Sequence, residues 1–254
     1  METTLRDLGT VAGAPASGDG VREIVGVLGG MGPAATADFF AKLVRATPAR
    51  VDQDHLRTII WSDPTIPDRT AALLSGGTDP TPWLLAGARM LRAAGAGVIA
   101  VPCNTAHAFL PSVQADVGVP FVHMIEETVL HIRSRLPRVR RVGLLSTTGT
   151  QASALYDEAL RRHGLEPVVP QAAAQSRVMA GIARVKAGVV DERTAWLVAS
   201  AALELIDAGA ETLVAGCTEL PMALEATEFD VPVIDPTQVL AEAVVAAVGR
   251  PHAA

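Results

Sequence analysis

The chain has 254 residues, of which 49 % are hydrophobic and 19 % charged, and its formal net charge is −6. This composition excludes a disordered or collagen-like chain, and an acidic chain lacks the basic surface that nucleic acid requires. The most apolar stretch, residues 196–206, already contains Glu204, so no run reaches the roughly 18 uncharged residues of a membrane span. We therefore expect a globular protein that binds neither nucleic acid nor a membrane.

The N-terminus and the cysteine content indicate a compartment. Residues 1–21 contain several Gly, Ala and Ser but no apolar core of a signal peptide, so we expect a flexible leader. The chain has two cysteines, Cys103 and Cys217, which is too few for a disulfide framework. These features predict a cytoplasmic protein in which both thiols are reduced.

Short apolar runs alternate with longer amphipathic stretches rich in Ala and Leu, as in strands that lead into helices around a mainly parallel sheet. In chain order, the pattern predicts strands at 24–28, 56–61, 97–101, 120–123, 141–145, 167–169, 211–215 and 231–234. It predicts helices at 34–46, 82–94, 125–136, 152–163, 173–186, 194–208 and 238–248. The predicted fold class is therefore α/β.

The two halves of the chain resemble each other in three segments. EIVGVLG at 23–29 corresponds to RRVGLLS at 140–146, AGAGVIAVPC at 94–103 to AGAETLVAGC at 208–217, and VPFV at 119–122 to VPVI at 231–234. Position 26 pairs with 143, 103 with 217 and 119 with 231, so the offsets are 117, 114 and 112, as expected of a duplication. We expect two pseudo-symmetric lobes, 22–122 plus 235–254 and 123–234, with an active site in the cleft between them.

Both cysteines follow a predicted strand and precede a helical stretch, so the two thiols should face each other across the cleft. A helix N-terminus favours a thiolate. A thiolate opposite a thiol is a general base opposite a general acid, which could invert a carbon centre without a cofactor. Two alternatives stay open: each cysteine could be a small buried core residue, or Cys103, His107 and Cys217 could bind zinc.

Other candidates flank the thiols, and each has a simpler structural interpretation. The glycine-rich segment 26–33 could bind an anion through its backbone N–H groups, and Asn104, Thr105 and Thr218 could hold a carboxylate and an amine. Segment 146–150 offers hydroxyls or merely caps a helix. Arg69, in a proline-containing loop, could bind a carboxylate or lie on the surface.

Two further residues have two possible roles each. Lys186 could contact a ligand or only interact with the dipole at the end of its helix. His107 lies four residues after Cys103, one helical turn on, so it could polarise the thiol or simply line the helix face.

Four motifs together carry a family resemblance. GGMGP at 29–33, PDRT at 67–70, CNTAH at 103–107 and GCTEL at 216–220 resemble the aspartate/glutamate racemase superfamily, most closely its aspartate racemase branch. The resemblance extends from about residue 22 to residue 248. It implies a homodimeric amino-acid racemase that acts on aspartate or glutamate and needs neither pyridoxal phosphate (PLP) nor another cofactor or metal.

The resemblance also implies roles for individual residues. Cys103 and Cys217 would act on opposite faces of the α-carbon, with His107 as possible support. Arg69 and Lys186 would hold the distal carboxylate, and Ile182 stands where family members often have a tyrosine. The remaining substrate-binding candidates are Met31, Gly32, Asn104, Thr105, Thr148, Thr218 and Glu219.

Two other functions remain possible on the same scaffold. Relatives in the superfamily racemise hydantoins, isomerise maleate or decarboxylate malonates, and some use one cysteine as a nucleophile. A two-lobed α/β protein could also be a non-catalytic sensor that closes on a small molecule.

Overall fold

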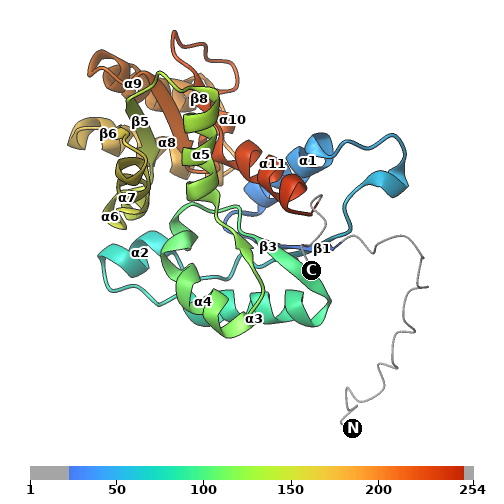
Figure 1. Cartoon of the computed structure of the whole chain (residues 1–254). Coiled ribbons are helices and arrows are strands. Elements are labelled where there is room, and N and C mark those ends of the chain that lie inside the picture. Colours follow the sequence, from blue (N-terminus) through green and yellow to red (C-terminus); the bar gives the residue numbers. More distant parts are fainter. Residues whose placement is uncertain (1–22, 249–254) are drawn as a thin grey trace.

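The structure is a computed structural model that describes residues 23–248, so the predicted leader at 1–21 and the residues after 248 lie outside the described part. Figure 1 shows two lobes, each built on its own sheet. Each sheet has four parallel strands with helices packed against it. None of the helices within residues 23–248 is long and apolar enough to cross a membrane.

The strands of the first lobe lie in the order β2-β1-β3-β4 in their sheet. Its strands are β1 (Ile24–Gly29), β2 (Thr58–Ser62), β3 (Ala96–Ala100) and β4 (Phe121–Val122). Its helices are α1 (Pro33–Ala46), α2 (Arg69–Leu74), α3 (Thr81–Ala93) and α4 (Leu110–Val117), with 3₁₀ turns η1 (Asp52–Asp54) and η2 (Thr105–Phe109).

The second sheet repeats this arrangement, with the order β6-β5-β7-β8. Its strands are β5 (Arg141–Ser146), β6 (Glu166–Val168), β7 (Thr212–Gly216) and β8 (Val233–Ile234). The helices from residue 124 onward are α5 (Met124–Arg135), α6 (Thr148–Ala152), α7 (Leu155–Arg162), α8 (Ala172–Lys186), α9 (Glu192–Asp207), α10 (Leu220–Leu224) and α11 (Pro236–Val248). The predicted α/β fold of two similar lobes is confirmed.

The equivalent glycines of β1 and β5 show why the lobes pack alike. A Cβ at Gly26 would lie 3.3 Å from the Leu91 Cβ on α3, and one at Gly143 would lie 3.3 Å from the Leu205 Cβ on α9. The missing side chain lets each helix approach its sheet closely.

The chain passes between the lobes twice. Val129 of α5 packs in the core of the second lobe with Val142, whereas Leu240 of α11 packs in the core of the first lobe with Val25. Lys42 of α1 lies near the second passage, where its Nζ contacts Asp235 at 2.6 Å just before α11. The division of the lobes at residues 122 and 234 stays a prediction.

The structure differs from the predicted elements in three places. The helix predicted at 152–163 exists as α7 but begins at Leu155, because α6 ends at Ala152 and Ala154 between them has a φ of +54°. The loop predicted at 65–70 ends at residue 68: Arg69 is the first residue of α2, and the Asp68 carboxylate caps that helix by accepting the Ala71 N–H at 2.7 Å. Helices α4 and α10 were not predicted, since both are short.

Candidate active site

Both thiols line one inner pocket between the lobes. Cys103 follows β3 and Cys217 follows β7, and their exposed fractions are 6 % and 7 %. The first lobe also contributes Met31, Asp68, Arg69, Thr70, Asn104 and Thr105, and the second contributes Thr147, Lys186, Thr218 and Glu219. The structure therefore brings most of the predicted site residues together.

The inner pocket is nearly closed. Its volume is about 20 Å³, which is room for about one water molecule, so the pocket does not hold an amino acid in this arrangement. A second cavity of about 410 Å³ adjoins it and shares Met31, Arg69, Lys186 and Glu219. Gly32, a predicted substrate contact, lines this outer cavity and not the inner pocket.

Arg69 is buried and held by its own loop. Its Nη1 donates to the carbonyl oxygens of Ile66 at 3.1 Å and Pro67 at 2.9 Å. Its Nε is buried and has no hydrogen-bond acceptor. Because an unsatisfied buried donor is costly, this nitrogen is a natural contact for a ligand oxygen in the pocket.

Asn104 offers a second donor of the same kind. The hydroxyl of Tyr156, a buried residue of α7, donates to Asn104 Oδ1 at 2.8 Å across the two lobes. This bond fixes the amide, and its Nδ2 is buried without a partner. Burial raises the pKa of Tyr156, so the phenol stays a neutral donor at physiological pH.

Hydroxyl groups join the lobes beside the thiols. Thr105 Oγ1 lies 3.0 Å from Thr147 Oγ1 and 2.8 Å from Thr150 Oγ1. Thr148, which the sequence suggested as a substrate contact, lies outside the inner pocket, and its backbone nitrogen is 3.4 Å from Met179 Sδ. Thr147 lines the pocket and also caps α6, so the capping role predicted for segment 146–150 is confirmed and its ligand-binding role stays a prediction.

The lobes also meet closely at Gly149 of α6, which packs against Thr70 of α2. A Cβ at Gly149 would lie 2.7 Å from Thr70 Oγ1 and 2.8 Å from Thr70 Cα. Both distances are shorter than a carbon contact allows, so the closed arrangement requires glycine at this position.

Glu219 lies directly beside Cys217. The Cys217 thiol donates to Glu219 Oε2 at 2.9 Å, and Thr218 Oγ1 donates to the same oxygen at 3.2 Å. Burial, and then the neighbouring Glu219 carboxylate, raise the pKa of the Cys217 thiol well above its ordinary value.

His107 supports the backbone of the site and lies outside the pocket lining. Its Nε2 accepts the Met124 N–H at 3.1 Å, so its Nδ1 must carry the proton and donate to the Cys103 carbonyl at 2.9 Å. Burial, and then the neighbouring His123, lower the pKa of His107 to about 3. Both ring nitrogens are thus used, and no group of three or more His, Cys, Asp or Glu within residues 23–248 is placed to hold a metal.

Two other predictions concern α8. Lys186 is its last residue and lines both cavities, so its side chain is available to a ligand. Ile182, one turn earlier, is only 2 % exposed and packs in the core of the second lobe.

Sequence reasoning missed Tyr156 altogether, and it named Thr147 only as part of segment 146–150. The rule that threonine caps helices favours Thr147 at the start of α6. Tyr156 is the single tyrosine of the chain, on a helix face with no special signal.

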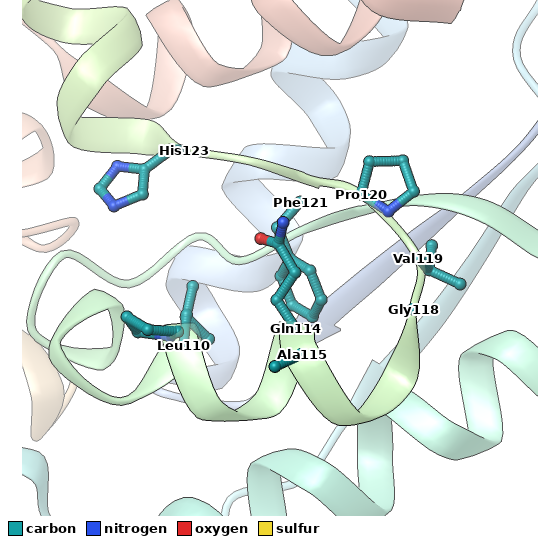
Figure 2. A pocket seen from close by; sticks show the side chains of 9 residues that line it. Leu110, Gln114, Ala115, Gly118, Val119, Pro120, Phe121 and His123 are labelled. Carbon is teal, nitrogen blue, oxygen red and sulfur yellow. The ribbon is translucent and has the colours of Figure 1, made fainter.

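A larger surface pocket lies between α4 and residues 118–123 (Figure 2). Its volume is about 720 Å³, and neither cysteine lines it. His123 lies at its edge and contacts His107 edge to face, with 4.7 Å between the ring centroids. Its apolar walls and lack of a nucleophile make the thiol pocket the better candidate for chemistry.

The sequence of residues 28–244 matches the family described as Asp/Glu/Hydantoin racemase. The chain belongs to this family. The similar proteins are amino-acid racemases, so this racemase-family protein is an enzyme of the isomerase class.

One curated relative and one solved structure resemble it over most of their length. The broad specificity amino-acid racemase RacX of Bacillus subtilis is 30 % identical, over 87 % of this chain and 96 % of RacX. The aspartate racemase of Picrophilus torridus is 31 % identical, with a TM-score of 0.79 over 90 % of this chain and 95 % of that one. A glutamate racemase of Francisella tularensis shares the fold. It is 19 % identical, with a TM-score of 0.69 over 90 % of this chain and 81 % of that one.

Proposed function

We propose that the protein racemises an acidic amino acid, aspartate or glutamate, by proton transfer between Cys103 and Cys217. One sulfur takes the α-proton as a thiolate, and the other delivers a proton to the opposite face. Because the thiols do both steps, the reaction needs no PLP. Neutral or charged donors around the pocket would stabilise the negative charge that develops on the substrate.

The observation that carries this proposal is the pair of buried donors without acceptors in the thiol pocket. Arg69 Nε and Asn104 Nδ2 both lack a partner, and both residues line the pocket that contains the cysteines. A substrate with two carboxylates could satisfy one donor at each end, with its α-carbon between the sulfurs. Lys186 would add a second positive charge near the distal carboxylate.

Incubation with L- or D-aspartate or glutamate in D₂O tests the reaction. The amino acid should lose its chirality while deuterium enters the α-position. Cys103→Ser and Cys217→Ser should each lower the rate by about 10²–10⁴-fold, because serine is a far weaker acid and base than cysteine at neutral pH. Chiral chromatography and mass spectrometry measure both effects.

Ser176→Ala is the control, since Ser176 is exposed on α8 and its hydroxyl bonds only the Ala172 carbonyl. This variant should racemise like the unchanged protein. Inversion without label, or full activity in either cysteine variant, would reject the two-thiol reaction. Stabilisation by aspartate with no turnover at all would instead favour the non-catalytic binding protein.

The outer cavity supports a second candidate, racemisation of amino acids with larger side chains. Its apolar residues include Pro64, Val185 and Met222, and its 410 Å³ exceed what an aspartate side chain fills. RacX, a relative named for broad specificity, is consistent with this candidate. A panel of L-amino acids without added cofactor, read by chiral chromatography, separates the two.

We also propose that the protein is cytoplasmic, from its cysteine content and N-terminal sequence, and that it is a homodimer, as the family resemblance implies. Light scattering coupled to gel filtration would give its mass. A mass near 26.4 kDa would contradict the dimer.

A further inference from the structure

The two thiols occupy equivalent positions in the lobes, but the residues that follow them differ. The offset of 114 residues between the cysteines pairs Thr105 with Glu219, two positions after each thiol. Thr105 directs its hydroxyl to Thr147 and Thr150. Glu219 accepts a hydrogen bond from its own cysteine. The pseudo-symmetry of the site is therefore broken at this position.

The surroundings of Glu219 favour a protonated Cys217. Glu219 is 3 % exposed, and its Oε2 accepts from both the Cys217 thiol and the Thr218 hydroxyl. If Cys217 lost its proton, the hydrogen bond from its thiol to Glu219 would be lost. The thiolate and the carboxylate would then repel each other at a separation of about 2.9 Å in a buried site. Within residues 23–248, the Cys103 sulfur makes no hydrogen bond to a carboxylate.

Among the other charged groups, Lys186 opposes Glu219, because its positive charge lowers the pKa of the Cys217 thiol, but burial and the Glu219 carboxylate outweigh it. Around the inner pocket these groups are Asp68, Arg69 and Lys186. The Asp68 carboxylate is engaged in capping α2, and the two cations face a pocket that both sulfurs line. The nearby phenol of Tyr156 stays neutral because of its burial.

We propose that Glu219 is a positioning residue that keeps Cys217 protonated in the resting protein, so that Cys217 is the acid of the pair and Cys103 is the sulfur that acts as the base. The catalytic meaning of this inference rests on the proposed racemisation. Cys103 would take the α-proton and become a thiol, while Cys217 gives its proton to the opposite face and becomes a thiolate. Afterwards Cys217 takes one proton from water and Cys103 releases one, which restores the resting state.

Alkylation by iodoacetamide tests the assignment because only the thiolate reacts. The two cysteine residues are almost equally exposed, so access should not decide the outcome. In the full-length protein at neutral pH, we expect Cys103 to be alkylated about tenfold faster than Cys217, as measured by peptide mass spectrometry. Glu219→Gln should raise the rate at Cys217 by about tenfold and leave Cys103 unchanged, since a neighbouring charge shifts a pKa by one unit or more.

Glu225→Gln is the matched control, because Glu225 is an exposed residue that follows α10 and lies outside both cavities. It should change neither rate. Equal alkylation of the two cysteines in the unchanged protein would overturn the assignment. An unaltered Cys217 rate in a folded Glu219→Gln protein would do the same.

A second measurement does not depend on the Glu219 variant. In Cys103→Ser the ultraviolet absorbance of the thiolate reports Cys217, and in Cys217→Ser it reports Cys103. The Cys217 thiolate should appear at the higher pH of the two, and the reverse order would refute the inference. Neither measurement needs turnover, so loss of the proposed racemase activity and loss of this assignment are separate results.

Discussion

The imidazole of His107 connects the backbone at Cys103 with the first residue of α5. One nitrogen donates to the Cys103 carbonyl and the other accepts the Met124 N–H, so the ring is needed in its neutral form. Protonation would place an unpaired positive charge in a fully buried site and break the bond from Met124. The ring therefore fixes the position of the cysteine through the main chain.

This arrangement predicts a pH-dependent stability. The pKa of His107 is about 3 in the folded protein, against an ordinary 6.5, so below pH 6.5 the unfolded chain binds a proton that the folded one refuses. The stabilisation is complete above pH 6.5, and the free energy of unfolding should fall by up to about 1.4 kcal/mol per pH unit as the pH drops toward 3. Urea unfolding between neutral and acidic pH measures it.

His107→Gln is the comparison for this prediction. Glutamine can make hydrogen bonds but does not titrate, so the variant should start less stable at neutral pH and lose less stability on acidification. Burial lowers the pKa of His123, and the variant retains this residue, so the difference between the two proteins reports mainly on His107. Parallel curves for the two proteins would contradict the assignment.

At the scale of elements, apolar patterning located the strands because buried parallel strands are continuous apolar runs. All eight predicted strands exist, and β1 and β5 begin at the predicted residues, Ile24 and Arg141. The break between α6 and α7 could not be predicted, since Ala154 adopts a left-handed conformation that sequence rules associate with glycine. Short helices such as α10 give too little periodicity to detect.

The candidate site was likewise predictable only where local sequence determines the position of a residue. Motifs located Cys103, Cys217 and Arg69, because strand ends and helix starts can be read from the sequence. The contact of Tyr156 with Asn104 joins residues 52 positions apart in different lobes, so no local sequence pattern indicates it. The unpaired donors likewise depend on the three-dimensional packing around them.

The backbone at Ala154 gives a prediction for stability. Ala154→Gly should raise the free energy of unfolding by about 0.5–1 kcal/mol, because the left-handed conformation costs alanine about 1–2 kcal/mol and glycine offsets part of that gain through its greater freedom when unfolded. Ala183→Gly, at an exposed helical position of α8, is the matched control and should lower it by about 0.5–1 kcal/mol. Urea denaturation measures both, and destabilisation by Ala154→Gly would contradict the argument.

For the whole molecule, the contacts between the lobes hold a closed form. The hydroxyls of Thr105 and Thr147 and the bond from Tyr156 to Asn104 cross from one lobe to the other beside the thiols. With about 20 Å³ inside, this form excludes bulk water and also excludes an amino acid. We therefore expect the lobes to separate before an amino acid binds.

Gly149 gives a direct test of this motion. Gly149→Ala should push α6 away from α2, because its Cβ would lie 2.7 Å from Thr70 Oγ1. We expect a larger radius of gyration by small-angle X-ray scattering and at least about tenfold weaker turnover, since a displacement near 1 Å at the reacting groups can cost 10²-fold. Adding Thr70→Ala should reverse part of both effects, and an unchanged radius with unchanged turnover would show that the lobes tolerate the methyl group.

A single methyl group at position 149 would then prevent the two lobes from closing fully. The two sheets and their hydrophobic cores would be unchanged. Each sulfur would keep its local environment, but the distance between the two sulfurs would increase. In such a protein the pocket would stay open, so an amino acid could be soaked into crystals and observed in the site before the lobes close around it.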